Sequence, residues 1–173
     1  MKLNEDYVQE TYTFQSFKCD AHNEEAVAAC KTVAEHPGAD SNPLLLIGES
    51  GCGKTHLLLA IRNVVMKKPD FNVIYTDMES YVNEVITAIR DVKMQELYER
   101  YRTAQMLLFD DLEFIAGKEA STEAFFYTIK DLCLNGYQVV ASASDPAELD
   151  RLPEHVAALF RRGRVVELSL STS

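Results

Sequence analysis

The sequence is poor in several features that define whole classes of protein. It contains no tryptophan and only four cysteines, which are scattered without a C-x-x-C pair. Scattered cysteines argue against a disulfide scaffold or a zinc ribbon and indicate a reducing compartment, so we expect a cytoplasmic protein. No apolar run approaches the ~20 residues of a membrane span, and residues 1–6 lack the apolar core of a signal peptide. We therefore expect no membrane partner.

Positive charge is also scarce. The chain has 17 Lys and Arg residues against 27 Asp and Glu residues, which gives a net charge of −10. Such a chain repels the phosphate backbone of nucleic acids instead of attracting it. Any contact with DNA must therefore be local, and we expect no binding of duplex DNA by this chain alone.

The pattern of the 173 residues indicates one α/β domain over 1–173, with a short N-terminal linker at 1–11. Helical and β-branched runs alternate, which is typical of a parallel sheet covered on both faces. Asn23 is expected to cap the first helix. The expected helices cover 24–35, 56–66, 80–90, 93–102 and 119–134, with short helical segments over 146–161. The expected strands cover 44–47, 72–76, 106–109, 138–143 and 164–170.

An apolar strand runs directly into a phosphate-binding motif. The spacing G-x-x-x-x-G-K-T begins at Gly48 and ends at Lys54 and Thr55. Glycines let the backbone curl so that successive N–H groups point at the phosphates, at the start of a helix whose dipole favours anions. Lys54 would neutralise the β- and γ-phosphates, and Thr55 would bind Mg²⁺. The predicted ATP or GTP site comprises Gly48, Glu49, Ser50, Gly51, Cys52, Gly53, Lys54, Thr55 and His56.

A second apolar strand ends in two adjacent carboxylates, Asp110 and Asp111. Acidic residues often end strands in solvent, but here the strand follows a loop-helix-strand-helix unit. In nucleotide hydrolases this position places one carboxylate at the Mg²⁺ shell and the other near the attacking water. We predict that Asp110 belongs to the metal shell and that Asp111 is catalytic and polarises water.

Several longer blocks are more specific than a phosphate loop alone: 12–14, 42–44 leading into the loop, 88–91, 107–119 and 123–128. Together they resemble the bacterial chromosomal replication initiator family, DnaA, most strongly over 12–130. The resemblance implies a three-layer P-loop NTPase of the AAA+ class with a five-stranded parallel sheet. It also implies ATP and Mg²⁺ as cofactors, and ATP-dependent self-association through the AAA+ faces at a replication origin.

Two helices are expected between the second strand and the Asp-Asp strand, where a minimal core of this class has one. In DnaA-like proteins this insertion shapes the filament and, with a basic residue after the Asp-Asp strand, lines a path for single-stranded DNA. Lys118 matches the basic position. Val82 and Ile86 lie in the region that meets the strand, although their spacing also suits simple packing. Ala120 stands where several relatives carry a second basic residue, so any binding of single-stranded DNA should be weak.

The segment after the fourth strand departs from the family pattern R-L-x-S-R-F, in which an arginine finger reaches a neighbour's γ-phosphate. Aligning Phe160 with the phenylalanine places Leu159 at the finger and His155 at the earlier arginine. Neither side chain can act as the finger. Arg161 or Arg162 could replace it after a shift of register, or could form a solvated basic turn.

The family also has a polar sensor residue at the end of the strand over 138–143. The register of this sequence allows Ser144 or Asp145, and we favour Ser144 as a second catalytic residue.

The sequence stops before the helical lid and the duplex-binding helix-turn-helix of the family, so we expect weak ATPase activity at most. Three functions fit these features. The first is an ATP-binding module that assembles for replication initiation. The second is a related helicase loader or regulator, with the replicative helicase or an initiator as its partner. The third is a nucleotide-responsive interaction module with little hydrolysis. The two-helix insertion favours the first.

Overall fold

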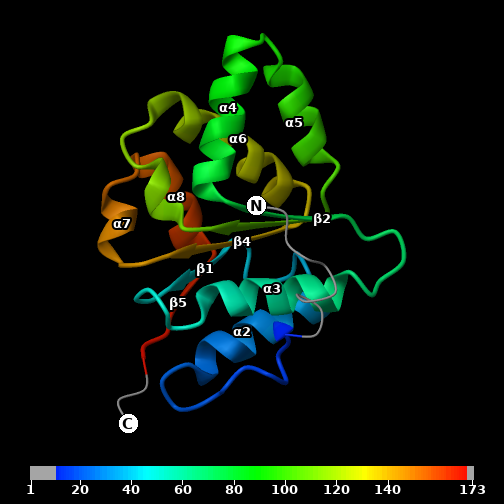
Figure 1. Cartoon of the computed structure of the whole chain (residues 1–173), viewed down its shortest axis with the longest axis vertical. Helices are drawn as coiled ribbons and strands as arrows, with labels where there is room; N and C mark the ends of the chain where they lie inside the picture. The colour runs from blue at the N-terminus through cyan, green and yellow to red at the C-terminus, as the bar shows by residue number, and fades with distance from the viewer. Residues whose placement is uncertain (1–10, 171–173) are drawn as a thin grey trace.

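The five strands form one parallel sheet in the order β2-β3-β4-β1-β5 (Figure 1). The structure, a computed structural model, describes residues 11–170. Each pair of neighbouring strands is parallel, which confirms the predicted α/β fold class. The strands are β1 (Leu44–Ile47), β2 (Val73–Asp77), β3 (Met106–Asp110), β4 (Gln138–Ala143) and β5 (Arg164–Glu167).

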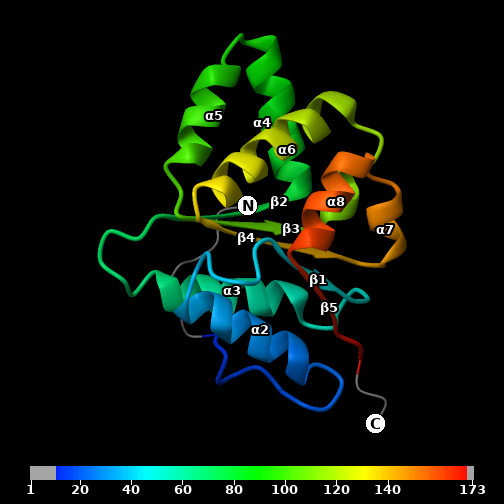
Figure 2. The same cartoon turned by 180° about the vertical axis from the view of Figure 1, so that it is seen from behind.

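Helices cover both faces of the sheet. All four residues of β1 are buried, and they alternate between two core clusters: Leu45 and Ile47 pack on one side, Leu44 and Leu46 on the other. Because side chains alternate along a strand, a strand covered on both faces is apolar throughout. One face carries α2 (Glu24–Glu35) and α3 (Lys54–Val65), and the opposite side carries α4 (Met78–Arg90), α5 (Met94–Arg102), α6 (Glu119–Leu134) and α8 (Glu154–Arg162) (Figures 1 and 2).

The predicted two-helix insertion is present between β2 and β3. We call α4, α5 and their connection, residues 78–102, the insertion hairpin; it projects away from the sheet (Figure 2). Asp77 caps α4, because its Oδ1 accepts a hydrogen bond of 2.8 Å from Ser80 N. Buried rings attach the hairpin to the sheet: Tyr81 lies 5.3 Å from Tyr101 and 5.5 Å from Phe109 between ring centres. The insertion is therefore part of the main core.

Some local predictions were wrong in detail. Asn23 stands at the start of α2, but its side chain does not cap the helix. Its Oδ1 instead accepts from Asp20 N at 2.9 Å, which stabilises the preceding turn. The last strand ends at Glu167 and not at residue 170, because its pairing with the short strand β1 ends there. The linker predicted over 1–11 lies, except for Thr11, outside the described residues.

Two short helical elements complete the described chain: the 3₁₀ turn η1 (Leu112–Ile115) after β3, and α7 (Ala147–Asp150) after β4. Between residues 11 and 170, none of the helices combines the length and apolarity that a membrane span needs.

Candidate nucleotide-binding site

The phosphate loop, residues 48–53, joins the carboxyl end of β1 to the first residue of α3. Gly51 and Gly53 have φ angles of +85° and +103°, which side chains disfavour. A Cβ atom at position 53 would also lie 2.5 Å from the ring of Phe17. Glycine at this position therefore meets two requirements, and α3 starts directly from the loop with its free N–H groups and the positive end of its dipole.

Lys54 is held close to the loop that precedes it. Its side chain is buried, with 7% exposed, and Nζ donates to Gly48 O and, at 3.0 Å, to Glu49 O. Cys52 is also buried, with its Sγ 3.9 Å from the same ammonium. No carboxylate forms an ion pair with Lys54 in the described part of the chain. A buried ammonium that is held by carbonyl groups and has no ion pair favours an anion beside it.

Asp110 lies at the end of β3 with only 2% of its surface exposed, and its carboxylate accepts hydrogen bonds from hydroxyl groups. Thr55 Oγ1 donates to Oδ2 at 2.5 Å, Tyr75 donates to the same oxygen at 3.0 Å, and Ser142 donates to Oδ1. Burial, followed by the charge of Asp110, raises the pKa of Tyr75, so its hydroxyl stays protonated and remains a donor. Thr55 and Asp110, predicted to share the metal shell, therefore lie in direct contact.

Asp111 points into a different environment. It is half-buried and adopts a left-handed backbone with φ of 59°. Burial, followed by the charges of Asp110 and Glu113, raises the pKa of Asp111 to about 6 from 3.8, and the charge of Lys54 opposes this rise. It lines a cavity of about 260 Å³ with eight other residues. The lining residues are Ser50, Gly51, Gly53, Lys54, Thr55, His56, Asp111, Glu113 and Ser144.

The cavity separates the two candidates for the sensor residue. Ser144 lines it together with Lys54 and Asp111. Asp145 uses its Oδ1 to accept a hydrogen bond of 2.8 Å from Ala147 N, at the start of α7. A carboxylate engaged in this turn has a structural role, which supports the choice of Ser144.

The segment over residues 12–17 covers the first turns of α3. Nε2 of His56 lies 2.8 Å from Thr13 O, and the rings of Tyr12 and Phe17 lie 5.3 Å and 5.0 Å from the imidazole. The sequence placed His56 in the nucleotide site, and the structure shows that it also anchors this N-terminal segment. The distant contact could not be read from the motif alone.

The residues predicted to meet single-stranded DNA differ in their exposure to solvent. Val82 is 4% exposed and packs in the core between the insertion hairpin and the sheet, so it is a core residue and the prediction that it contacts DNA was wrong. Ile86, one turn later, is 55% exposed. Lys118 is exposed, and its Nζ donates to Phe114 O at 2.6 Å.

The helix α8 carries the positions aligned with the arginine finger. Leu159 is partly buried against the core, and His155 lies 3.3 Å from Glu123 and against the ring of Phe126. Arg161 donates to Asp150 Oδ1 at 2.9 Å. Arg162 lines a separate cavity between α6 and α8. Neither arginine lines the cavity at the phosphate loop.

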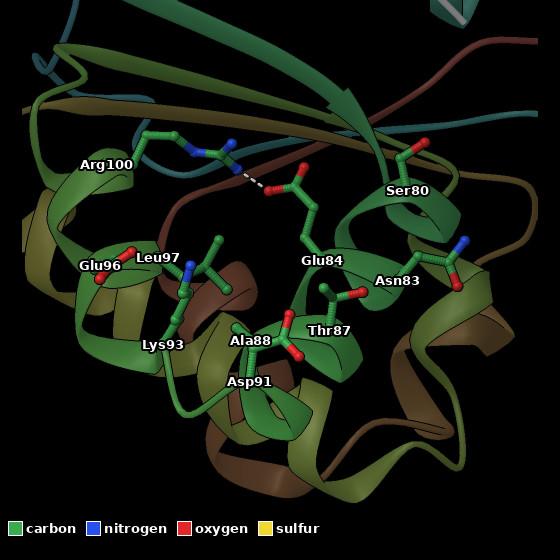
Figure 3. A pocket seen from close by; sticks show the side chains of 10 residues that line it. All are labelled: Ser80, Asn83, Glu84, Thr87, Ala88, Asp91, Lys93, Glu96, Leu97 and Arg100. Carbon is green, nitrogen blue, oxygen red and sulfur yellow. Dashed lines mark ion pairs between the residues drawn. The ribbon is translucent and has the colours of Figure 1, made fainter.

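A larger cavity, of about 640 Å³, lies between α4 and α5 and away from the phosphate loop (Figure 3). Glu84 and Arg100 face each other across this groove and form an ion pair. The groove has charges of both signs and no phosphate-binding loop, so we place the nucleotide in the smaller cavity. The larger cavity, between α4 and α5, is lined by Ser80, Asn83, Glu84, Thr87, Ala88, Asp91, Lys93, Glu96, Leu97 and Arg100.

A parallel sheet with a phosphate loop at the carboxyl end of one strand and a buried aspartate at the end of another defines the P-loop NTPase class. Comparison with known proteins narrows this class. The sequence matches the bacterial DnaA ATPase domain family over residues 8–167, and the chain belongs to that family.

Individual relatives agree with this assignment. The chain is 43% identical over 159 residues to the chromosomal replication initiator protein DnaA of Herpetosiphon aurantiacus, covering 91% of this chain and 34% of that protein. Domain III of the Thermotoga maritima initiator superimposes with a TM-score of 0.88 at 34% identity, over 97% of this chain and 69% of that one. The structure of a DnaA bound to AMPPCP and single-stranded DNA superimposes with a TM-score of 0.88 at 29% identity, over 92% of this chain and 50% of that one.

The chain thus spans about a third of the length of the curated relative from Herpetosiphon. Family membership confirms the resemblance deduced from the sequence blocks and favours an initiator domain over a helicase loader.

Proposed function

We propose that this chain binds ATP with Mg²⁺ at the phosphate loop and acts as the nucleotide-binding domain of a replication initiator. One observation carries the proposal: buried Lys54 and buried Asp110 stand at the same edge of the sheet, with Thr55 in contact with Asp110. A DnaA structure with AMPPCP bound supports the choice of an ATP-like ligand. We further propose that residues 1–173 belong to one such domain.

The side chains at this edge suit Mg²⁺. This ion is usually held in nucleotide sites by one or two carboxylates together with phosphate oxygens and water. Between residues 11 and 170 there is no group of three or more His, Cys, Asp and Glu side chains of the kind that would hold a metal ion without such help. Thr55 and Asp110 would hold the ion, which would supply neutralisation of phosphate charge. Thr55 and Asp110 would fix the position of the positive charge relative to the phosphates.

Asp111 and Ser144 are the proposed catalytic residues. Both line the cavity at the loop, and the raised pKa of Asp111 suits a group that takes a proton from water. Leu159 supplies no cation for a neighbour's γ-phosphate, so we expect slow hydrolysis in the isolated protein.

We also propose assembly and DNA contact, because the chain belongs to the DnaA family. ATP-dependent self-association would use the AAA+ faces, and single-stranded DNA would meet Lys118 and Ile86, which are both exposed. A DnaA bound to single-stranded DNA supports the second idea. The replicative helicase or another initiator would be a further partner.

The test is to separate the two carboxylates. Asp110→Asn should weaken Mg²⁺-dependent binding of a fluorescent ATP analogue, because it removes the charge that faces Thr55. Asp111→Asn should leave binding intact and abolish hydrolysis measured by phosphate release. Asp131→Asn on α6 is a matched control on the protein surface. If both site variants lose affinity equally, the division of roles is wrong.

A further inference from the structure

The carboxylate of Asp110 accepts a hydrogen bond from a hydroxyl group on each of the two neighbouring strands. In the register of β3 and β4, Phe109 pairs with Ala141, so the next residues, Asp110 and Ser142, stand side by side. In β2, Asp77 pairs with Asp110, and Tyr75 lies two residues earlier on the same face of the strand. The three strands therefore bring both hydroxyl groups to a single carboxylate.

The hydroxyl of Ser142 serves both acidic residues. It donates to Asp110 Oδ1, and it accepts a hydrogen bond of 3.0 Å from Asp111 N. Asp111 has the left-handed backbone that residues with a side chain rarely adopt. A bond to its N–H from a fully buried serine holds this turn in place. One side chain thus sets the direction of the Asp110 carboxylate and the backbone from which Asp111 projects.

The hydroxyl of Tyr75 acts on the other oxygen. Oδ2 of Asp110 accepts from Tyr75 at 3.0 Å and from Thr55 at 2.5 Å. With Oδ1 bound to Ser142 and Oδ2 bound to Tyr75, the carboxylate is held from both sides and cannot rotate away from Thr55 without breaking a buried hydrogen bond. Breaking such a bond leaves a buried polar group unpaired, which is costly.

We infer that Ser142 and Tyr75 are positioning residues of the metal shell, which fix Asp110 against Thr55 and, through Ser142, fix the turn that carries Asp111. The inference rests on the Mg²⁺ site of the proposed function and extends it to two residues outside both sequence motifs. Neither Ser142 nor Tyr75 lines the cavity at the phosphate loop, so their effect on nucleotide binding passes through Asp110 and, for Ser142, also through the backbone of Asp111.

The experiment compares binding of a fluorescent ATP analogue to the full chain in EDTA and in Mg²⁺. The ratio of the two affinities measures the Mg²⁺ enhancement. Tyr75→Phe, which conserves nearly all of the volume, and Ser142→Ala should each reduce this enhancement about three- to tenfold, as expected for the loss of one hydrogen bond. The affinity in EDTA should stay at the wild-type value, which also shows that each variant is folded.

Matched substitutions elsewhere control for the loss of a hydroxyl group. Tyr98→Phe, on α5 with its ring against Tyr127, and Ser121→Ala, buried on α6, should leave the enhancement unchanged. On an Asp110→Asn background, Tyr75→Phe and Ser142→Ala should cause no further reduction, because the group they position has already lost its charge.

The outcomes separate this inference from the proposed function. If wild type shows Mg²⁺ enhancement and both Tyr75→Phe and Ser142→Ala retain it, the positioning role is overturned and the Mg²⁺ site stands. An equal loss of affinity in EDTA would show a general structural role and would also overturn the inference. If wild type binds equally well with and without Mg²⁺, the Mg²⁺ site itself fails, and the inference fails with it.

Discussion

The carboxyl edge of the sheet and the insertion hairpin differ in how far their charged side chains are buried. At the edge, Lys54 and Asp110 are 7% and 2% exposed, and each is held by several hydrogen bonds. On the hairpin, the ion pair of Glu84 and Arg100 has side chains 31% and 56% exposed. Buried, bonded groups have one position and resist change, whereas exposed ion pairs contribute little to stability. The charged side chains at the edge therefore have fixed positions suited to binding phosphate and Mg²⁺. The stability of the hairpin depends on the apolar residues of its buried face.

The largest expected effect lies at the edge. Lys54→Ala should reduce the affinity for ATP at least about 100-fold, because it removes charge-assisted hydrogen bonds to phosphate worth about 1.5–3 kcal/mol each. Isothermal titration calorimetry measures this, with Lys93→Ala on the hairpin as the matched control. An unchanged affinity in Lys54→Ala would remove the basis for the phosphate-loop assignment, and an equal loss in Lys93→Ala would erase the contrast between the two regions.

The hairpin itself contains a contrast between its two faces. Val82→Ala should lower the free energy of unfolding by about 2 kcal/mol, because it opens a cavity in a packed core. Ile86→Ala, at an exposed position on the same helix, should change it by less than about 0.5 kcal/mol. Urea denaturation of the two variants measures the difference. Equal effects would mean that Val82 does not pack as the structure places it.

A smaller effect is expected from Asp111 in metal-free buffer. Its pKa is raised to about 6 from 3.8, so the folded chain favours the protonated form. The corresponding stability is present below about pH 4 and is lost as the pH rises through 6. Asp111→Asn should therefore stabilise the protein at pH 7.5, by on the order of 1 kcal/mol after solvent screening is allowed for, and have little effect at pH 4.

Thermal unfolding at the two pH values tests this, and Asp40→Asn, at an exposed position before β1, is the control. A stabilisation of equal size at both pH values would exclude the ionised carboxylate as its cause.

The smallest effect concerns the contact with DNA. Single-stranded DNA should bind weakly, with a dissociation constant on the order of 10⁻⁴–10⁻⁶ M, and only with ATP present. Lys118→Ala should weaken binding and reduce the slope of log K against log salt by about 0.7, the value for one phosphate contact. Fluorescence anisotropy with a labelled oligonucleotide measures both. Lys130→Ala on α6 is the control, and an identical loss there would point to general charge and not to a path beside Lys118.

Much of the nucleotide edge could be predicted, because its main residues are contiguous in the chain. The loop from Gly48 to Thr55 carries its own backbone requirements, and the structure starts α3 at Lys54 as the motif demands. The pair Asp110 and Asp111 was recognised from one apolar strand. The order of helices and strands followed from hydrophobic periodicity, which registers burial on one face or on both.

Residues that lie far from the motifs in the sequence but contact them in the fold could not be predicted in the same way. The polar residue Ser142 appeared to be an ordinary part of an apolar strand, and Tyr75 an ordinary β-former. A signal did exist for Ser142, since a fully buried serine in such a strand needs a hydrogen-bond partner. The partner depends on strand order and register, which the sequence does not state.

The sequence by itself determined the phosphate loop, the acidic pair, the α/β class and the family, because each depends on local backbone conformation, periodic burial or contiguous blocks. The tertiary structure decided which side chains meet. It placed Val82 in the core and Ile86 on the surface, used Asp145 in a turn and left Ser144 at the cavity. It also enclosed Asp110 between hydroxyl groups from β2 and β4. The physical reason is that hydrogen bonds between strands depend on register to within one residue, since a shift of one residue turns every side chain to the opposite face.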